Sequence, residues 1–184
     1  MTRTTTPGPR LARMARSLAI ALAATLLAAF VLAGAGRAAD LPRPGGAVVL
    51  TISGNIAHTN APDRAEFDLD MLREIGLRSF STSTMWTEGI SEYHGVALHD
   101  VLRRVGASGT TVTAIALNDY SAELPMAEVA AEVPILAFLR DGRPMPVRDK
   151  GPLWVLYPYD SDRAFRTENI YSRSVWQLDR LHVD

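Results

Sequence analysis

The chain contains no cysteine, and this absence limits the ways in which any fold can be stabilised. A disulfide bond requires two cysteines, and a thiolate metal centre requires at least one. The folded protein must therefore depend on a packed apolar core. The residues that follow position 38 are numerous enough to form one such core.

The first 38 residues have the pattern of an export signal. Arginines precede an uncharged apolar run from Leu18 to Leu32, and small residues follow that run, so cleavage is expected near Ala35 or Ala38. The run is shorter than the roughly 20 apolar residues of a membrane span, which favours a cleaved signal over a retained anchor. No adjacent arginine pair precedes it, so the export route for proteins folded around a cofactor has no visible signal. The sequence predicts a signal peptide over 1–38 and a periplasmic protein.

The charge of the remaining chain excludes one class of partner. The predicted signal holds five of the 19 basic residues and none of the 20 acidic ones, which leaves 14 basic residues and a formal charge of −6. Nucleic acids and anionic membrane surfaces need a positive patch. We therefore expect no nucleic-acid partner.

Apolar patterns predict a mixture of strands and short helices after a mobile, Pro/Gly-rich lead-in over 39–46. Helices are expected after the N-cap residue Asp68, before the stop residue Gly106, and over 125–131. Asp141 and Gly142 have the residue types of a tight hairpin turn. Strands are expected over 48–54, 77–84, 111–117, 133–140, 153–157 and 172–183. Because strands and helices do not alternate regularly along the chain, this order predicts one α+β domain with mixed β-sheets over 47–184.

Four short segments carry a resemblance to a known family. They are Thr84-Met85-Trp86-Thr87 with Gly89, Gly95-Val96-Ala97-Leu98, Asn118-Asp119-Tyr120 ahead of Pro125, and Lys150-Gly151-Pro152 followed by Trp154 and Pro158. Together they resemble the sulfite-oxidase-type oxidoreductase molybdopterin-binding domain, which implies the sulfite-oxidase-like fold. The family binds molybdenum through a cysteine that precedes the tryptophan, and here that position falls at Thr82 or Ser83. A hydroxyl is neither soft nor ionised at neutral pH, so no metal ligand is expected.

Within this fold the chain resembles the small cysteine-free periplasmic proteins that bind pterins. This narrower resemblance implies a non-catalytic protein with no tightly bound cofactor and with a reduced pterin, tetrahydrofolate-like or monapterin-like, as its ligand. It implies a partner as well, the periplasmic domain of a membrane-bound cyclic-di-GMP enzyme or sensor kinase. Two alternatives stay open: a molybdopterin-dependent oxidoreductase subunit that lacks the usual cysteine ligand, and a structural or chaperone-like domain with an empty pocket.

The requirements of a pterin assign roles to several residues. Its flat ring needs an aromatic face, which Trp86 and Tyr120 can supply, and its amino edge needs acceptors, which Asn118 or Asp119 can supply. The hydroxyl-rich strand that contains Thr82 and Ser83 can hydrogen-bond a ligand without attacking it. The alternatives are that Trp86 is a core residue and that Asn118 and Asp119 form a turn.

A second group of ligand contacts is expected in the loop with Arg148, Lys150 and Gly151. Two cations flank a glycine there, which suits a ligand carboxylate or phosphate. The alternative is a solvated loop whose charges pair locally. Arg173 and Trp176 are expected to form a cation–π pair.

Catalysis has little support in the sequence. The four histidines do not have the spacing of a pair of metal ligands, and the hydroxyls of 81–84 lack the surroundings of a nucleophile. The histidines are His58, His94, His99 and His182. The sequence therefore predicts no catalytic residue.

Overall fold

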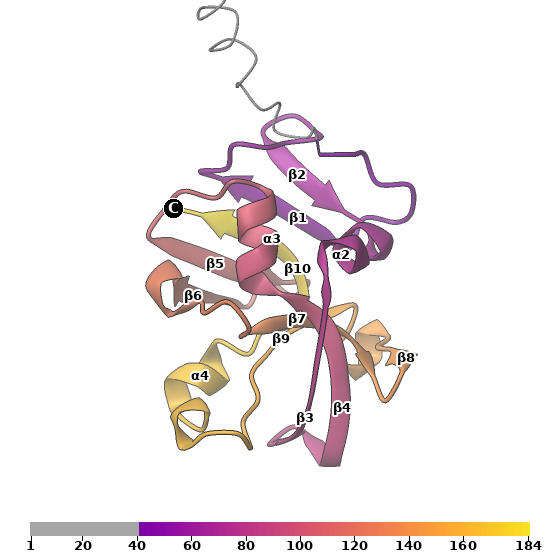
Figure 1. Cartoon of the computed structure of the whole chain (residues 1–184), viewed down its shortest axis with the longest axis vertical. Helices are drawn as coiled ribbons and strands as arrows, with labels where there is room; N and C mark the ends of the chain where they lie inside the picture. Colours follow the sequence, from indigo (N-terminus) through magenta and orange to yellow (C-terminus); the bar gives the residue numbers. More distant parts are fainter. Residues whose placement is uncertain (1–40) are drawn as a thin grey trace, which may run out of the picture. The chain divides into compact units, whose positions relative to one another are not determined.

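The computed structural model describes residues 41–184, so the predicted signal peptide and its cleavage sites lie outside the described residues. Within 41–184, ten strands form one sheet (Figure 1). The strands are β1 (Leu50–Gly54), β2 (Arg64–Phe67), β3 (Leu77–Thr84), β4 (Thr87–Ala97), β5 (Thr111–Ala116), β6 (Ser121–Pro125), β7 (Ile135–Arg140), β8 (Arg143–Pro144), β9 (Leu153–Leu156) and β10 (Trp176–Val183). The α-helices are α2 (Leu69–Ile75), α3 (Leu98–Arg104) and α4 (Glu168–Ser172), and short 3-10 turns are η1 (Met126–Glu128), η2 (Val147–Asp149) and η3 (Arg163–Phe165).

The sheet is mixed, which confirms the predicted α+β class. Its main order is β2-β1-β10-β9-β7-β4-β3, while β5 pairs with β10 and β6, and β8 pairs with β7. Strands β1 and β10 are parallel, and the other named pairs are antiparallel. Strand β10 therefore touches three neighbours, β1, β5 and β9.

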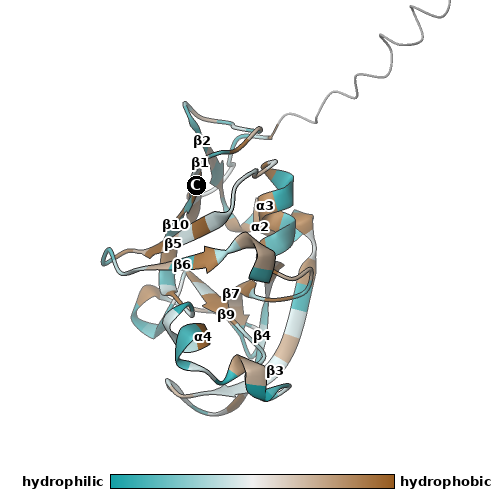
Figure 2. Ribbon diagram, turned by 90° about the vertical axis from the view of Figure 1, so that its left-hand side faces the viewer, coloured by the Kyte–Doolittle hydropathy of each residue, from teal (hydrophilic) through white to brown (hydrophobic). Residues whose placement is uncertain are grey.

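The core lies around the central strands and under two helices. All four residues of β9 and the first four of β7 are buried. Helices α2 and α3 contact each other and β4, and α3 buries Leu98, Val101 and Leu102. The hydropathy colouring of Figure 2 places apolar residues on β7 and β9 and polar ones along the outer faces of the helices. Within residues 41–184, no helix is long and apolar enough to cross a membrane.

Several predicted boundaries are confirmed. Strand β3 covers the predicted 77–84, and Asp68 caps α2 by accepting a hydrogen bond from the Met71 N–H at 2.9 Å. Gly106 follows α3 with a φ of 62°, a conformation that favours glycine. Asp141 and Gly142, with φ values of 50° and 74°, turn β7 into β8.

Other predictions need correction. The lead-in is anchored over 41–46, because Leu41 is only 5% exposed and the Gly46 N–H donates to Asp68 Oδ2 at 2.7 Å. The last strand begins at Trp176, since 168–172 forms α4 instead. The helix expected over 125–131 is reduced to η1, and strands β2, β4 and β6 were not predicted.

A backbone irregularity marks the start of β10. Trp176 pairs with Trp154 of β9, and the register then shifts at Gln177, whose φ is 53°. The Gln177 N–H donates to the Lys150 carbonyl and its side chain to the Val147 carbonyl, at 2.9 and 2.7 Å. This bulge lets one strand leave β9 and continue between β1 and β5.

Candidate functional site

An aromatic cluster surrounds Trp86, which lies in the turn between β3 and β4. The Trp86 ring makes edge-to-face contacts with four other rings, with centroid distances of 5.4 to 6.1 Å. These partners are Trp154, Tyr159, Tyr171 and Trp176. The chain has three tryptophans, and all of them belong to this cluster.

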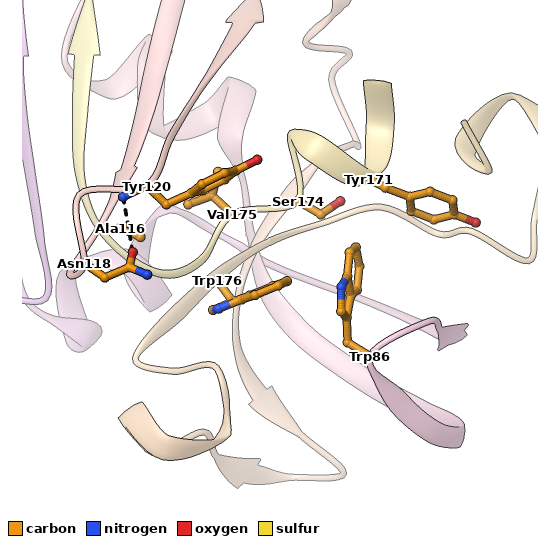
Figure 3. A pocket seen from close by; sticks show the side chains of 8 residues that line it. All are labelled: Trp86, Ala116, Asn118, Tyr120, Tyr171, Ser174, Val175 and Trp176. Carbon is orange, nitrogen blue, oxygen red and sulfur yellow. Dashed lines mark hydrogen bonds between the residues drawn. The ribbon is translucent and has the colours of Figure 1, made fainter. Parts of the chain in front are cut away.

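One side of the cluster opens into a pocket of about 220 Å³. Its walls come from the β3–β4 turn, the end of β5, the loop before β6, and the segment from α4 to β10 (Figure 3). The lining residues are Trp86, Ala116, Asn118, Tyr120, Tyr171, Ser174, Val175 and Trp176. Four aromatic side chains in so small a space suit the faces of a flat ligand ring.

Local hydrogen bonds fix the two walls that carry Trp86 and Tyr171. The backbone N–H of Trp86 donates to Thr84 Oγ1 at 3.1 Å, and the Thr84 and Thr87 hydroxyl oxygens lie 2.8 Å apart. These two contacts close the hairpin turn. Helix α4 begins at the N-cap residue Thr167, whose hydroxyl accepts from the Ile170 N–H. The turn therefore holds Trp86 against α4, and Tyr171 lies on that helix.

The loop before β6 contributes Asn118 and Tyr120 to the pocket but turns Asp119 away. Asn118 Oδ1 accepts from the Tyr120 N–H at 3.2 Å, and the Tyr120 hydroxyl donates to the Ser172 carbonyl at 2.8 Å. Asp119 has a φ of 63°, and its exposed carboxylate pairs with Arg180 at 2.7 Å. The prediction that Asp119 contacts the ligand is not supported by this geometry, which corresponds to the alternative of a turn.

Thr82 and Ser83 contact an aspartate rather than the aromatic pocket. Thr82 is fully buried, and its hydroxyl accepts from the Asp160 N–H at 3.2 Å while donating to the Ser83 carbonyl. Ser83 donates to the Asp160 carboxylate through its N–H and its hydroxyl, at 2.5 and 2.9 Å. These two Ser83 hydrogen bonds, together with the Arg166 guanidinium, lower the pKa of Asp160.

Ser83 and Asp160 line a second, polar cavity of about 290 Å³. It shares Tyr171 with the aromatic pocket, so the two spaces adjoin at that side chain. Arg166 also lines it, and its guanidinium contacts Asp160 Oδ1 at 2.8 Å. The charged groups of this cavity are thus already paired.

The predicted loop contacts separate in the structure. Arg148 is 87% exposed in its side chain and lies near Asp149, which corresponds to the alternative of a solvated loop with local pairing. Gly151 is buried, and a Cβ there would lie 1.7 Å from the Met145 carbonyl oxygen, so its closeness serves backbone packing rather than a ligand. Neither Arg148 nor Gly151 lines the aromatic pocket.

Lys150 contacts the aromatic cluster from outside the pocket lining. Its Nζ lies 4.4 Å from the Trp176 ring centroid and 5.7 Å from that of Trp154. Burial lowers the pKa of its ammonium group. The predicted cation–π partner of Trp176, Arg173, instead forms an ion pair with Glu128. Lys150 takes that role because the bulge hydrogen bond places its backbone beside β10.

A buried hydroxyl network supports the pocket floor. The Tyr159 hydroxyl donates to Ser174 Oγ at 2.6 Å, and Ser174 Oγ donates to the Ile170 carbonyl at 2.7 Å. Burial raises the pKa of Tyr159 and of Tyr157 well above the usual range, so both phenols stay neutral.

The structure brings together Trp86, Asn118 and Tyr120, three of the predicted ligand contacts, and adds Tyr171 and Trp176. Tyr171 was not expected, because the helix that carries it has only five residues and no apolar periodicity. Trp176 was assigned to packing. Its place directly before Gln177 in the bulge has no local sequence pattern that would reveal it.

A metal site needs several donor side chains that lie close together. Within 41–184, no three His, Cys, Asp or Glu side chains gather closely enough to hold a metal ion.

A family model, described as the oxidoreductase molybdopterin binding domain, matches residues 67–160. Among curated proteins, none matches the chain.

Proposed function

Because the chain belongs to the oxidoreductase molybdopterin-binding domain family, we propose that its aromatic pocket binds a reduced pterin and performs no chemistry on it. The observation that carries this proposal is the group of four aromatic side chains, Trp86, Tyr120, Tyr171 and Trp176, around one small pocket with a single carboxamide. A flat bicyclic ring gains about 0.5 to 1.5 kcal/mol from each such ring contact beyond simple burial.

The cofactor that the family implies does not fit the donors present. A molybdenum ion held in the manner of this family needs a soft, ionised thiolate, and the chain has no cysteine. Thr82, at the corresponding position, is fully buried, and its hydroxyl already bonds Asp160 and Ser83. Ser83 Oγ donates to the Asp160 carboxylate. The hydroxyls that replace the thiolate are thus occupied in holding the loop around Asp160.

We further propose that the protein acts in the periplasm as a ligand-dependent partner of a membrane-bound cyclic-di-GMP enzyme or sensor kinase. Exposed side chains in the loop before β6 support this idea, since the lining residue Tyr120 is 49% exposed and Leu117 is 48% exposed. The Tyr120 hydroxyl also joins the loop to the end of α4. A bound ligand that contacts Tyr120 and Tyr171 changes both segments, and a partner that prefers one arrangement senses the ligand.

Ligand binding is tested by intrinsic fluorescence, because every tryptophan lies in the cluster. The domain over 39–184 is titrated with tetrahydrofolate, a reduced monapterin and guanosine, and thermal unfolding is followed in parallel. We expect the reduced pterins to quench the fluorescence and, at a hundred times the Kd, to stabilise the fold by about 2.7 kcal/mol. Failure of both reduced pterins to do either would refute the proposal.

Metal content is tested on protein isolated from its native host. We expect elemental analysis to find no stoichiometric molybdenum, since no thiolate is available to hold it. About one molybdenum atom per chain would overturn the proposal in favour of the oxidoreductase alternative.

A further inference from the structure

Among the residues that line the aromatic pocket, several carry hydrogen-bond donors without a partner in the described chain. Three nitrogen donors form no hydrogen bond with any residue of 41–184: the indole N–H groups of Trp86 and Trp176 and the amide Nδ2 of Asn118. Neither indole nitrogen is sealed in the core, because no buried side-chain nitrogen or oxygen in the described chain lacks a partner. Figure 3 shows the amide nitrogen of Asn118 on the side of Trp176, and the indole nitrogen of Trp86 on the side of its ring that faces Trp176.

Three acceptors around the same space already accept hydrogen bonds from the protein. Ser174 Oγ accepts from Tyr159, and the Ala116 carbonyl accepts from the Asp119 N–H at 2.9 Å. The Asn118 oxygen accepts from the Tyr120 N–H. The Tyr171 hydroxyl points away from Trp176 in Figure 3. If a ligand placed its own N–H groups in the pocket, they would meet the N–H groups of the protein.

We propose that the pocket binds the acceptor edge of its heterocycle, a carbonyl oxygen beside a ring nitrogen, and leaves the amino edge toward solvent. This inference rests on the proposed function and reverses one expectation from the sequence, in which Asn118 or Asp119 accepts hydrogen bonds from the amino edge. The reversal follows from two contacts, since Asp119 pairs with Arg180 and Asn118 uses its oxygen on Tyr120. The Asn118 amide nitrogen has no protein partner within residues 41–184, so Asn118 offers a ligand free donors.

The test compares three dihydropteridines that differ only at their edges. The first is 7,8-dihydro-6-methylpterin. The second is the corresponding lumazine, in which an oxygen replaces the 2-amino group, and the third is the 2,4-diamino analogue, in which an amino group replaces the 4-carbonyl. Binding is measured by tryptophan fluorescence. We expect the lumazine to bind within about threefold of the pterin, because its 4-carbonyl edge is intact. The diamino analogue should bind on the order of a hundredfold more weakly, because donors meet donors.

Two outcomes separate the inference from the function on which it rests. If none of the three compounds binds, the proposed function fails and the inference fails with it. If the pterin and the diamino analogue bind alike, or the lumazine loses most of the affinity, the pterin function stands and the acceptor-edge orientation is wrong.

Asn118→Asp tests the donor itself. The aspartate keeps an oxygen for the Tyr120 N–H but puts an acceptor where the amide nitrogen was. We expect weaker pterin binding and a ratio between pterin and diamino analogue that shrinks at least tenfold. A variant that weakens all three compounds equally would show that Asn118 only shapes the loop. The matched control is Asp119→Asn, outside the pocket, which should leave all three affinities within about twofold.

Discussion

Replacing Trp86 by alanine should weaken both ligand binding and the fold, in amounts that the geometry allows us to separate. Trp86 contacts four rings but is only partly buried. Truncating a fully buried large aromatic residue costs about 3 to 5 kcal/mol, so about half of that, ~2 kcal/mol, is expected for the free energy of unfolding. Lost stacking and burial should cost a ligand a further ~1 to 3 kcal/mol, a severalfold to hundredfold rise in Kd.

The two effects are measured separately, by urea denaturation and by calorimetric titration with a reduced pterin. A domain of ordinary stability, about 5 to 15 kcal/mol, tolerates the loss, so unfolding should stay cooperative with an unchanged m-value. The matched control is Met85→Ala in the same turn, at a side chain that is 67% exposed and does not line the aromatic pocket. We expect it to change stability by no more than about 0.5 kcal/mol and Kd by less than twofold.

Two results would refute this reasoning. Unchanged pterin affinity in a destabilised Trp86→Ala protein would make Trp86 a core residue and not a ligand contact. Equal losses in Trp86→Ala and Met85→Ala would show that the turn, rather than the indole ring, matters.

Three further changes probe the scaffold. Asp68→Ala should cost about 1 to 2 kcal/mol at pH 7. Hydrogen bonds from the Met71 and Gly46 N–H groups hold the pKa of Asp68 below 3.8. The stability that the Asp68 carboxylate contributes is therefore lost as acid protonates it. Urea titrations should show that the difference in free energy of unfolding between the wild-type protein and Asp68→Ala becomes smaller below pH 3.8. Burial raises the pKa of the Tyr157 phenol above 10.0 in the folded protein. As pH rises, the phenol therefore ionises at a lower pH in the unfolded chain than in the folded one. The free energy of unfolding should then fall above pH 10 by up to about 1.4 kcal/mol per pH unit. In Tyr157→Phe, the free energy of unfolding should fall less steeply above pH 10, because the contribution of this phenol is gone. An unchanged dependence on pH would show that Tyr157 does not cause the loss of stability. Gly151→Ala should prevent folding, because its Cβ would overlap the Met145 carbonyl, and a native circular dichroism spectrum at 37 °C would argue against such tight packing.

Elements with a local signal could be predicted from the sequence. Strand β3 and the capped helix α2 follow from alternation and from Asp68 and Gly76, since each signal lies within the element itself. Helix α4 has five residues and begins at Thr167 in a polar segment, so periodicity could not reveal it. The 11-residue strand β4 exposes three consecutive residues near its start, which hides the alternation expected of a strand.

The pocket was only partly predictable for the same reason. Trp86, Asn118 and Tyr120 stand in segments that resemble the family, so they could be named without a structure. Whether Asp119 or Asn118 faces the pocket depends on a left-handed backbone at Asp119 and on Arg180, which is 61 residues away. The contact of Lys150 with Trp176 likewise depends on long-range backbone pairing at the bulge, which no local pattern encodes.

The place of β10 in the sheet constrains when the protein can fold. Within residues 41–184, strands β1 and β5 are joined in the sheet only through β10, which also pairs with β9 and spans Trp176–Val183. During synthesis on the ribosome, more than a hundred residues separate β1 from its partner, so the sheet cannot close until translation has passed that point. Until then the emerging chain lacks the strand that joins β1, β5 and β9, a state that a chaperone can hold. Deleting 176–183 should leave a chain that cellular proteases degrade rather than a smaller folded domain.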